Sequence, residues 1–98
     1  MRYNYEISVR AIQKVRRFYR NVAMKYRHTY SYEDMYRNIN QAVDDMYLIE
    51  QTFLRRRPTL SRWQGYHMAT NGLWYYAYSI EGSTITIHDA CHAQNMHE

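Results

Sequence analysis

The chain has 98 residues, with 13 Lys and Arg against nine Asp and Glu, so its formal net charge is +4. This length supports a single modest core, which excludes a second independent domain and predicts one domain over residues 1–98. No apolar run approaches the roughly 20 residues of a membrane-spanning helix, whereas the mild positive charge is compatible with a polyanionic partner.

The chain begins with a strand-like segment and continues as an amphipathic helix. In YNYEISV, residues 3–9, apolar and polar side chains alternate with period two, which predicts a half-buried strand. From Ala11 to Tyr26 apolar residues recur at helical spacing and basic residues occupy the other faces. This pattern predicts a basic amphipathic helix.

A second helix is predicted after the segment HTYSYED. Ser31 precedes Asp34 by three residues, a spacing typical of a capping box at a helix start. Apolar residues from Met35 to Phe53 then follow in steps of three and four, which indicates a seam against another helix or a sheet. Pro58 cannot donate a backbone hydrogen bond and disfavours helical geometry in the residue before it, so we expect the second helix to end at RRRP.

Three strands are predicted in the last third of the chain. A strand near Gly65–Thr70 precedes Asn71-Gly72, the dipeptide most typical of a two-residue hairpin turn with positive φ at both positions. This turn leads into LWYYAYSI, and a second reversal at Glu81-Gly82-Ser83 leads into TITIHDA. The predicted fold is therefore α+β in the order β-α-α-β-β-β, a small antiparallel sheet with a helical hairpin packed on one face.

Side-chain alternation in the last two strands predicts which face of the sheet the helices cover. The apolar row, expected to point toward the helices, consists of Trp74, Tyr76, Tyr78, Ile80, Ile85 and Ile87. The opposite face, expected to be polar, aromatic and uncovered, would carry Tyr75, Ala77, Ser79, Thr84, Thr86, His88, Ala90 and His92.

Imidazoles on an uncovered face suggest acid–base chemistry, because histidine titrates near neutral pH and can exchange a proton with a reacting hydroxyl. RNA cleavage uses the 2′-hydroxyl of the RNA as nucleophile, so the protein need supply only a base, an acid and cationic stabilisation, with no metal or other cofactor. We predict His88, His92 and Tyr75 as catalytic residues. The residues predicted to bind nucleic acid are Arg55, Arg56, Arg57, Arg62 and His67.

Two other interpretations of these residues remain open. His88, Cys91, His92 and His97 include ligands that zinc accepts, although neither C-x-x-C nor H-E-x-x-H occurs in the chain. An exposed histidine can also be a solvated strand residue, and the RRR run can be a helix end whose cations oppose the helix dipole.

The terminal segment WYYAYSIEGSTITIHDACHAQN, together with the predicted order of elements, resembles the RelE/ParE superfamily of bacterial toxin–antitoxin toxins. Members characteristically close with an aromatic strand of the form Y-x-x-x-Y-x-I, a short turn and an apolar strand running into His or His-Arg. Tyr78 and Ile80 match the Y-x-I, and His92 matches the histidine. Ribonuclease members often carry an arginine three residues before the matching tyrosine, where this chain has Tyr75, and another after the histidine, where it has Ala93.

The resemblance implies a type II toxin that is neutralised by a cognate antitoxin protein. One branch of the superfamily cleaves mRNA in the ribosome, so the first expectation is a metal-independent endoribonuclease that inhibits translation. Another branch poisons DNA gyrase without catalysis, which the absence of an arginine at Tyr75 favours, and a third alternative is a non-catalytic protein-interaction domain of the same fold. We expect a cytoplasmic location, since Cys91 has no intrachain partner and no signal peptide is visible, and we expect that the free protein can pair with itself.

Overall fold

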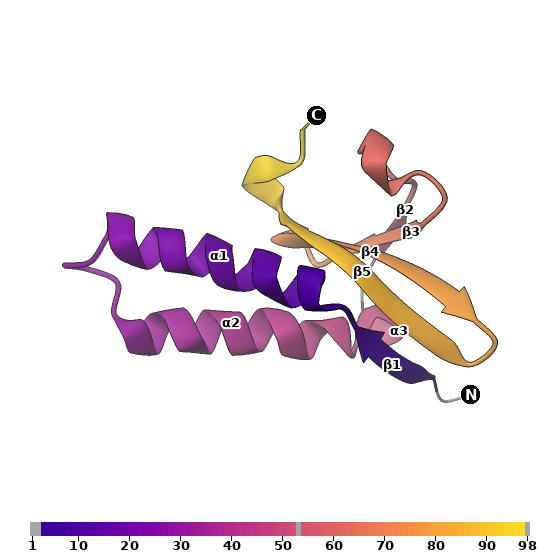
Figure 1. Cartoon of the computed structure of the whole chain (residues 1–98), viewed down its shortest axis with the longest axis horizontal. Helices are drawn as coiled ribbons and strands as arrows, with labels where there is room; N and C mark the ends of the chain where they lie inside the picture. Colours follow the sequence, from indigo (N-terminus) through magenta and orange to yellow (C-terminus); the bar gives the residue numbers. More distant parts are fainter. Residues whose placement is uncertain (1–2, 53, 98) are drawn as a thin grey trace.

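In the computed structural model, the chain forms a five-stranded mixed sheet with two long helices against one face (Figure 1). The structure describes the backbone of residues 3–52 and 54–97, and the side chains of these residues except 51–56. In chain order the elements are β1 (Asn4–Ile7), α1 (Val9–Lys25), α2 (Tyr32–Met46), α3 (Ile49–Thr52), β2 (Leu54–Arg56), η1 (Ser61–Trp63), β3 (His67–Thr70), β4 (Trp74–Glu81), β5 (Thr84–His92) and η2 (Ala93–Asn95). The tip of the α1–α2 hairpin extends beyond the sheet and gives the molecule its long dimension (Figure 1).

The predicted α+β class and the order β-α-α-β-β-β are confirmed, with the helical hairpin packed on one sheet face. The strand order across the sheet is β1-β5-β4-β3-β2, and β3, β4 and β5 form the predicted antiparallel meander. The sheet is not antiparallel throughout, because β1 pairs in parallel with β5, from Asn4 opposite Thr84 to Ile7 opposite Ile87. Parallel neighbours require a long connection, which the helices and the other strands supply here.

The second helix ends earlier than the sequence pattern predicts. α2 stops at Met46, the short α3 follows, and residues 54–56 pair with β3 as the edge strand β2. The expectation of a helix reaching RRRP is therefore wrong. Pairing with β3 satisfies backbone hydrogen-bonding groups of residues 54–56. Pro58 is compatible with either outcome, because it can follow the end of a strand as well as the end of a helix. Phe53, the last position of the predicted helical seam, lies outside the described residues.

Side-chain caps fix where both long helices begin. At α1, Ser8 Oγ accepts a hydrogen bond from the backbone N–H of Ala11 at 3.1 Å. At α2 the predicted capping box is present: Ser31 Oγ accepts from the N–H of Asp34, and the Asp34 carboxylate accepts from the N–H of Ser31, both at 3.1 Å. The hydrogen bond from the backbone N–H of Ser31 is the largest cause that lowers the pKa of Asp34, because it favours the charged carboxylate.

Replacing Ser31 by Ala should lower the free energy of unfolding by about 1 kcal/mol, the usual cost of losing an N-terminal side-chain cap. Urea denaturation followed by circular dichroism measures the change. Ser31→Asp is the matched control, because a carboxylate can accept the same N–H and also favours a helix N-terminus. An equal loss in both variants would show that the cap does not stabilise the fold.

The hairpin at Asn71-Gly72 is confirmed, but its turn differs from the predicted one. Gly72 has a φ of +92°, whereas no described residue other than glycine has a positive φ, so Asn71 does not adopt the conformation of a primed turn. Instead, Asn71 Oδ1 accepts hydrogen bonds from the N–H groups of Leu73 and Trp74 at 2.9 and 2.8 Å. The asparagine side chain thus closes the turn, as Asn commonly does in loops.

The main core lies between the helices and the sheet. Its sheet side contains the predicted apolar row, in which Trp74, Tyr76, Tyr78, Ile85 and Ile87 are buried. The polar atoms of two of these rings have partners: Trp74 Nε1 donates to Tyr19 Oη at 3.0 Å, and Tyr76 Oη donates to the carbonyl of Ala42 at 2.9 Å. Burial raises the pKa of Tyr76, so its hydroxyl stays protonated and able to donate.

Candidate functional site

A β-bulge in the terminal hairpin decides where the histidines of β5 lie. Tyr78 pairs with Ile87, but Ala77 pairs with Asp89, so His88 is an extra residue with no partner across the ladder. An extra residue shifts the alternation, and every later side chain points to the opposite face from the one that strict alternation predicts. The carbonyl of His88 accepts a hydrogen bond from Ser8 Oγ at 2.9 Å, which ties the bulge to the start of α1.

Asp89 provides a physical reason for the bulge. Strict alternation would place its carboxylate among the apolar side chains under the helices, where an ionised group is costly. With the bulge, it lies on the face opposite the helices, which we call the open face. There Trp63 Nε1 donates to Asp89 Oδ2 at 3.0 Å and the Arg62 guanidinium lies 3.8 Å from the carboxylate, whereas the Lys14 ammonium approaches to 3.7 Å from α1.

His88 and His92 therefore point to opposite faces of the sheet. His88 lies on the open face, as predicted. The prediction that Ala90 and His92 follow it there is wrong, because both pack on the helix side. His92 is 7% exposed, and its ring is stacked on Phe18 with centroids 4.0 Å apart and set edge-on to Trp74 at 5.3 Å. The two imidazoles cannot serve as acid and base on one bound phosphate.

Burial lowers the pKa of His92 from its ordinary value of 6.5, and its Nδ1 accepts a hydrogen bond from the N–H of Gln94 at 3.2 Å. The unfolded chain binds a proton near pH 6.5, whereas folded His92 binds one only at lower pH. The contribution of this neutral ring to stability is thus fully present above pH 6.5 and is lost as the pH falls through the lower pKa of the folded state.

We expect His92→Phe to remove part of the fall in unfolding free energy between about pH 7 and about pH 5, because phenylalanine keeps the ring stack but binds no proton. Urea denaturation at several pH values measures the slope. His28→Gln, at an exposed position in the hairpin, is the matched control and should leave the slope unchanged. A slope that is the same in wild type and His92→Phe would contradict the buried, neutral state of this ring.

His88 is held by two neighbours on the open face. Its Nε2 lies 2.7 Å from Ser79 Oγ, within hydrogen-bond distance, and the Tyr66 ring stacks on the imidazole with centroids 4.5 Å apart. His88 and Ser79 are half-buried, and Tyr66 is exposed. Within the described residues, nothing hydrogen-bonds to Nδ1 of His88. This His88 cluster (His88, Ser79 and Tyr66) thus fixes the ring and leaves one nitrogen able to exchange a proton.

Tyr75 lies on the open face but does not belong to the His88 cluster. It pairs with Cys91, three residues further along β5, a separation of about 10 Å at the rise of a strand. Tyr75 instead lines a shallow groove together with Arg57, Thr59, Met68 and Met96. The three predicted catalytic residues are thus not brought together. His92 lies on the helix side of the sheet, and His88 and Tyr75 lie in different regions of the open face.

The open face is partly covered, contrary to the prediction of an uncovered face. Leu60 and Trp63, from the segment around η1, pack over the middle of the hairpin and are each 1% exposed. They form a second small core with Met68, Ala77 and Cys91. This cover lies between the His88 cluster and Tyr75, because Ala77 and its partner Asp89 separate them along the hairpin.

The arginines predicted to bind phosphate differ in whether a nearby carboxylate compensates their charge. Arg57 is exposed and lies beside Tyr75 in the shallow groove. Arg62 also lies on the open face, but its guanidinium is close to Asp89 and lies over the Trp63 ring, 5.8 Å from the centroid. Its charge is therefore partly compensated. The predictions for the side chains of Arg55 and Arg56 lie outside the described residues.

His67 does not join His88. It stands opposite Tyr78 in the pairing of β3 with β4, and the two rings lie 5.2 Å apart. Since Tyr78 belongs to the helix-side core, His67 projects from the helix-side face, where it is exposed beyond the helices. Of the three histidines in the predicted set, His88 alone lies on the open face.

Cys91 is buried next to the open face, and burial raises the pKa of its thiol. A thiol in this state is a poor nucleophile and a poor metal ligand. In the part of the chain that the structure describes, no group of three His, Cys, Asp or Glu side chains is placed to hold a metal ion. Over the same residues, no helix combines the length and the apolar character that crossing a bilayer requires.

Comparison with known proteins gives no match, either to a protein-family model, to a curated protein or to a solved structure. The resemblance to the RelE/ParE superfamily therefore depends on the terminal segment and the order of elements in this chain.

Proposed function

We propose that the chain is the toxin of a type II toxin–antitoxin pair and acts on mRNA as a metal-independent endoribonuclease. The observation that supports this proposal is the His88 cluster, in which Ser79 and Tyr66 hold an imidazole on the open face with Nδ1 available. Neutral histidine near physiological pH is the side chain best suited to take a proton from a hydroxyl.

In the proposed reaction, His88 removes the proton of a 2′-hydroxyl and the 2′-oxygen attacks the adjacent phosphorus. The bond from phosphorus to the 5′-oxygen then breaks. The products are a 2′,3′-cyclic phosphate and a 5′-hydroxyl, whose oxygen takes its proton from water or from protonated His88. The proposed reaction moves only protons and exchanges one phosphorus–oxygen bond for another, so it needs no oxidant, reductant or metal. With one imidazole in place, acid–base catalysis contributes a rate factor of about 10²–10⁴.

Arg57 and Tyr75 have a binding role in this proposal rather than a catalytic one. Both line one groove, in which Tyr75 lies about 10 Å along the strand from His88, so we assign them to a nucleotide next to the one that His88 contacts. An exposed guanidinium beside a half-buried tyrosine can instead hold a neighbouring nucleotide, the arginine at its phosphate and the ring at its base.

Incubation of the purified protein with RNA in the presence of a chelator, alone and in a translation reaction, tests the proposal. We expect fragments that end in 2′,3′-cyclic phosphate. Intact RNA in both settings would overturn it. Co-expression of a cognate antitoxin should relieve the growth arrest that follows induction of the toxin.

A non-catalytic inhibitor of DNA gyrase is the second candidate, and the burial of His92 favours it. The ribonuclease branch of the resemblance implies a functional histidine after the last strand, whereas this ring is packed against Phe18. Inhibition of gyrase supercoiling with intact RNA would establish this alternative. If growth is normal, gyrase is active and RNA stays intact, the remaining alternative is a non-catalytic protein-interaction domain.

A further inference from the structure

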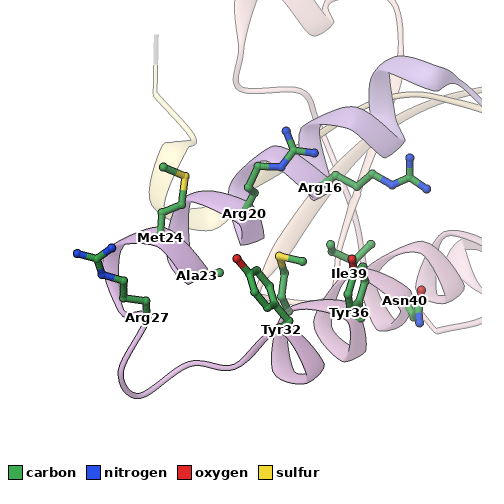
Figure 2. Close-up of a pocket in the computed structure, with 10 residues that line it drawn as sticks. Arg16, Arg20, Ala23, Met24, Arg27, Tyr32, Tyr36, Ile39 and Asn40 are labelled. Atoms are coloured by element: carbon green, nitrogen blue, oxygen red, sulfur yellow. The ribbon is translucent and has the colours of Figure 1, made fainter.

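A groove runs along the α1–α2 hairpin, away from the sheet site. It has a volume of about 700 Å³, and all of its lining comes from the two helices and the turn that joins them. The lining residues are Arg16, Arg20, Ala23, Met24, Arg27, Tyr32, Met35, Tyr36, Ile39 and Asn40. Figure 2 shows the arginines extending from the α1 side and the tyrosines rising from α2.

The groove is positively charged. Arg16, Arg20 and Arg27 are exposed, and within the described residues no ion pair or hydrogen bond engages their guanidinium groups. No acidic residue lines the groove, and α1 contains none along its whole length. Asp34, at the start of α2, already accepts hydrogen bonds from Ser31 and Arg37. Glu33, also in the first turn of α2, is not a lining residue, so no carboxylate among the lining residues compensates the positive potential of the groove.

Aromatic rings stand on the other side of the groove. Tyr32 is 74% exposed and Tyr36 is 61% exposed. Their spacing of four residues on α2 places both rings on the same side of the helix, one turn apart. Of the apolar lining residues, Ala23, Met35 and Ile39 are more than nine-tenths buried, whereas Met24 is 71% exposed. The groove thus presents guanidinium groups and tyrosine rings, with the Met24 side chain as its exposed aliphatic surface.

We propose that this groove binds a segment of single-stranded RNA, with Arg16, Arg20 and Arg27 at successive phosphates and bases stacked on Tyr32 and Tyr36. Arg16 and Arg20 lie one turn apart on α1, about 6 Å at helical rise, and Arg27 follows in the turn after the helix ends at Lys25, so the three arginines can meet a short run of nucleotides. Planar guanidinium groups suit phosphate, and aromatic platforms beside cations are the usual recognition elements for single strands. An acidic helical peptide would also match the charge, but helix docking uses several apolar anchor points, and among the aliphatic lining residues only Met24 is exposed.

Fluorescence anisotropy with a labelled oligouridylate carrying 2′-O-methyl groups tests the proposal. This probe cannot be cleaved, so a failure of the proposed nuclease activity does not affect the result. The triple variant Arg16→Gln/Arg20→Gln/Arg27→Gln should lose most of the binding. Its matched control, Arg10→Gln/Arg17→Gln/Lys25→Gln, lowers the formal net charge of +4 by the same three units at α1 positions outside the groove.

The expected result is a drop in affinity of about 30-fold or more for the groove variant and only a few-fold for the control, since contacts at the site add to the general effect of charge. The double variant Tyr32→Leu/Tyr36→Leu should weaken binding by about 10-fold or more through lost stacking. Circular dichroism and thermal unfolding establish that each variant is folded.

Three results would overturn the proposal. One is an equal loss of affinity in the two triple variants, which would show that net charge alone drives binding. Another is unchanged affinity in the tyrosine variant. The third is displacement of the RNA by a polyglutamate peptide at lower concentration than by unlabelled RNA, which would make an acidic protein segment the occupant.

Discussion

Replacing His88 by Ala is expected to reduce the rate of RNA cleavage by about 10²–10⁴-fold, the contribution of a positioned acid–base group. The free energy of unfolding should change little, because His88 is half-buried at a bulge and its Ser79 partner can turn to water. Initial rates on a defined RNA and urea denaturation, measured on the same preparations, check both parts.

His92→Phe is the matched histidine substitution for this experiment. Residue 92 lies on the other sheet face, so the His92→Phe variant should cleave RNA at close to the wild-type rate. Ser79→Ala should lower the rate by about 10-fold at most, because it loosens the imidazole without removing it. Cleavage at the wild-type rate in His88→Ala would contradict the proposed role of this residue.

Replacing Trp63 by Ala is expected to lower the free energy of unfolding by about 3–5 kcal/mol, the usual cost of removing a buried tryptophan. The expected cost is high because Trp63 covers the middle of the open face and donates to the buried Asp89 at 3.0 Å. Urea denaturation followed by far-ultraviolet circular dichroism measures the change.

Trp63→Phe separates packing from the hydrogen bond. Phenylalanine keeps most of the buried surface but leaves Asp89 without the indole N–H, which should cost about 1–3 kcal/mol. Tyr32→Ala, at an exposed position, should stay within about 0.5 kcal/mol of the wild type. A loss in Trp63→Ala as small as that of Tyr32→Ala would mean that the segment around η1 does not cover the sheet.

Local patterns in the sequence predict much of the fold. Ser31 and Asp34 identify the start of α2, the alternation in WYYAYSI identifies the buried face of β4, and Gly82 marks the last turn, with a φ of +59°. The end of α2 is less predictable from sequence. Whether residues 54–56 extend a helix or pair with β3 depends on a neighbour that sequence periodicity does not reveal.

The candidate site was harder to predict, because one extra residue reverses every later side chain in β5. The available signal was Asp89, an acid in a position that strict alternation buries among Ile85, Ile87 and the helices. A bulge is the local solution that moves such a group out of a core. Ser79 and Tyr66 were missed as partners of His88, since Tyr66 lies in a segment with no regular period.

In the proposed function, the bulge places His88, and not His92, where RNA binds. Histidine ring resonances in nuclear magnetic resonance spectra, recorded during titration with a 2′-O-methyl oligonucleotide, test it most directly. We predict that the His88 signals shift as the oligonucleotide binds and that the His92 signals stay in place. Unchanged His88 signals at saturating oligonucleotide, or shifts confined to His92, would contradict the claim.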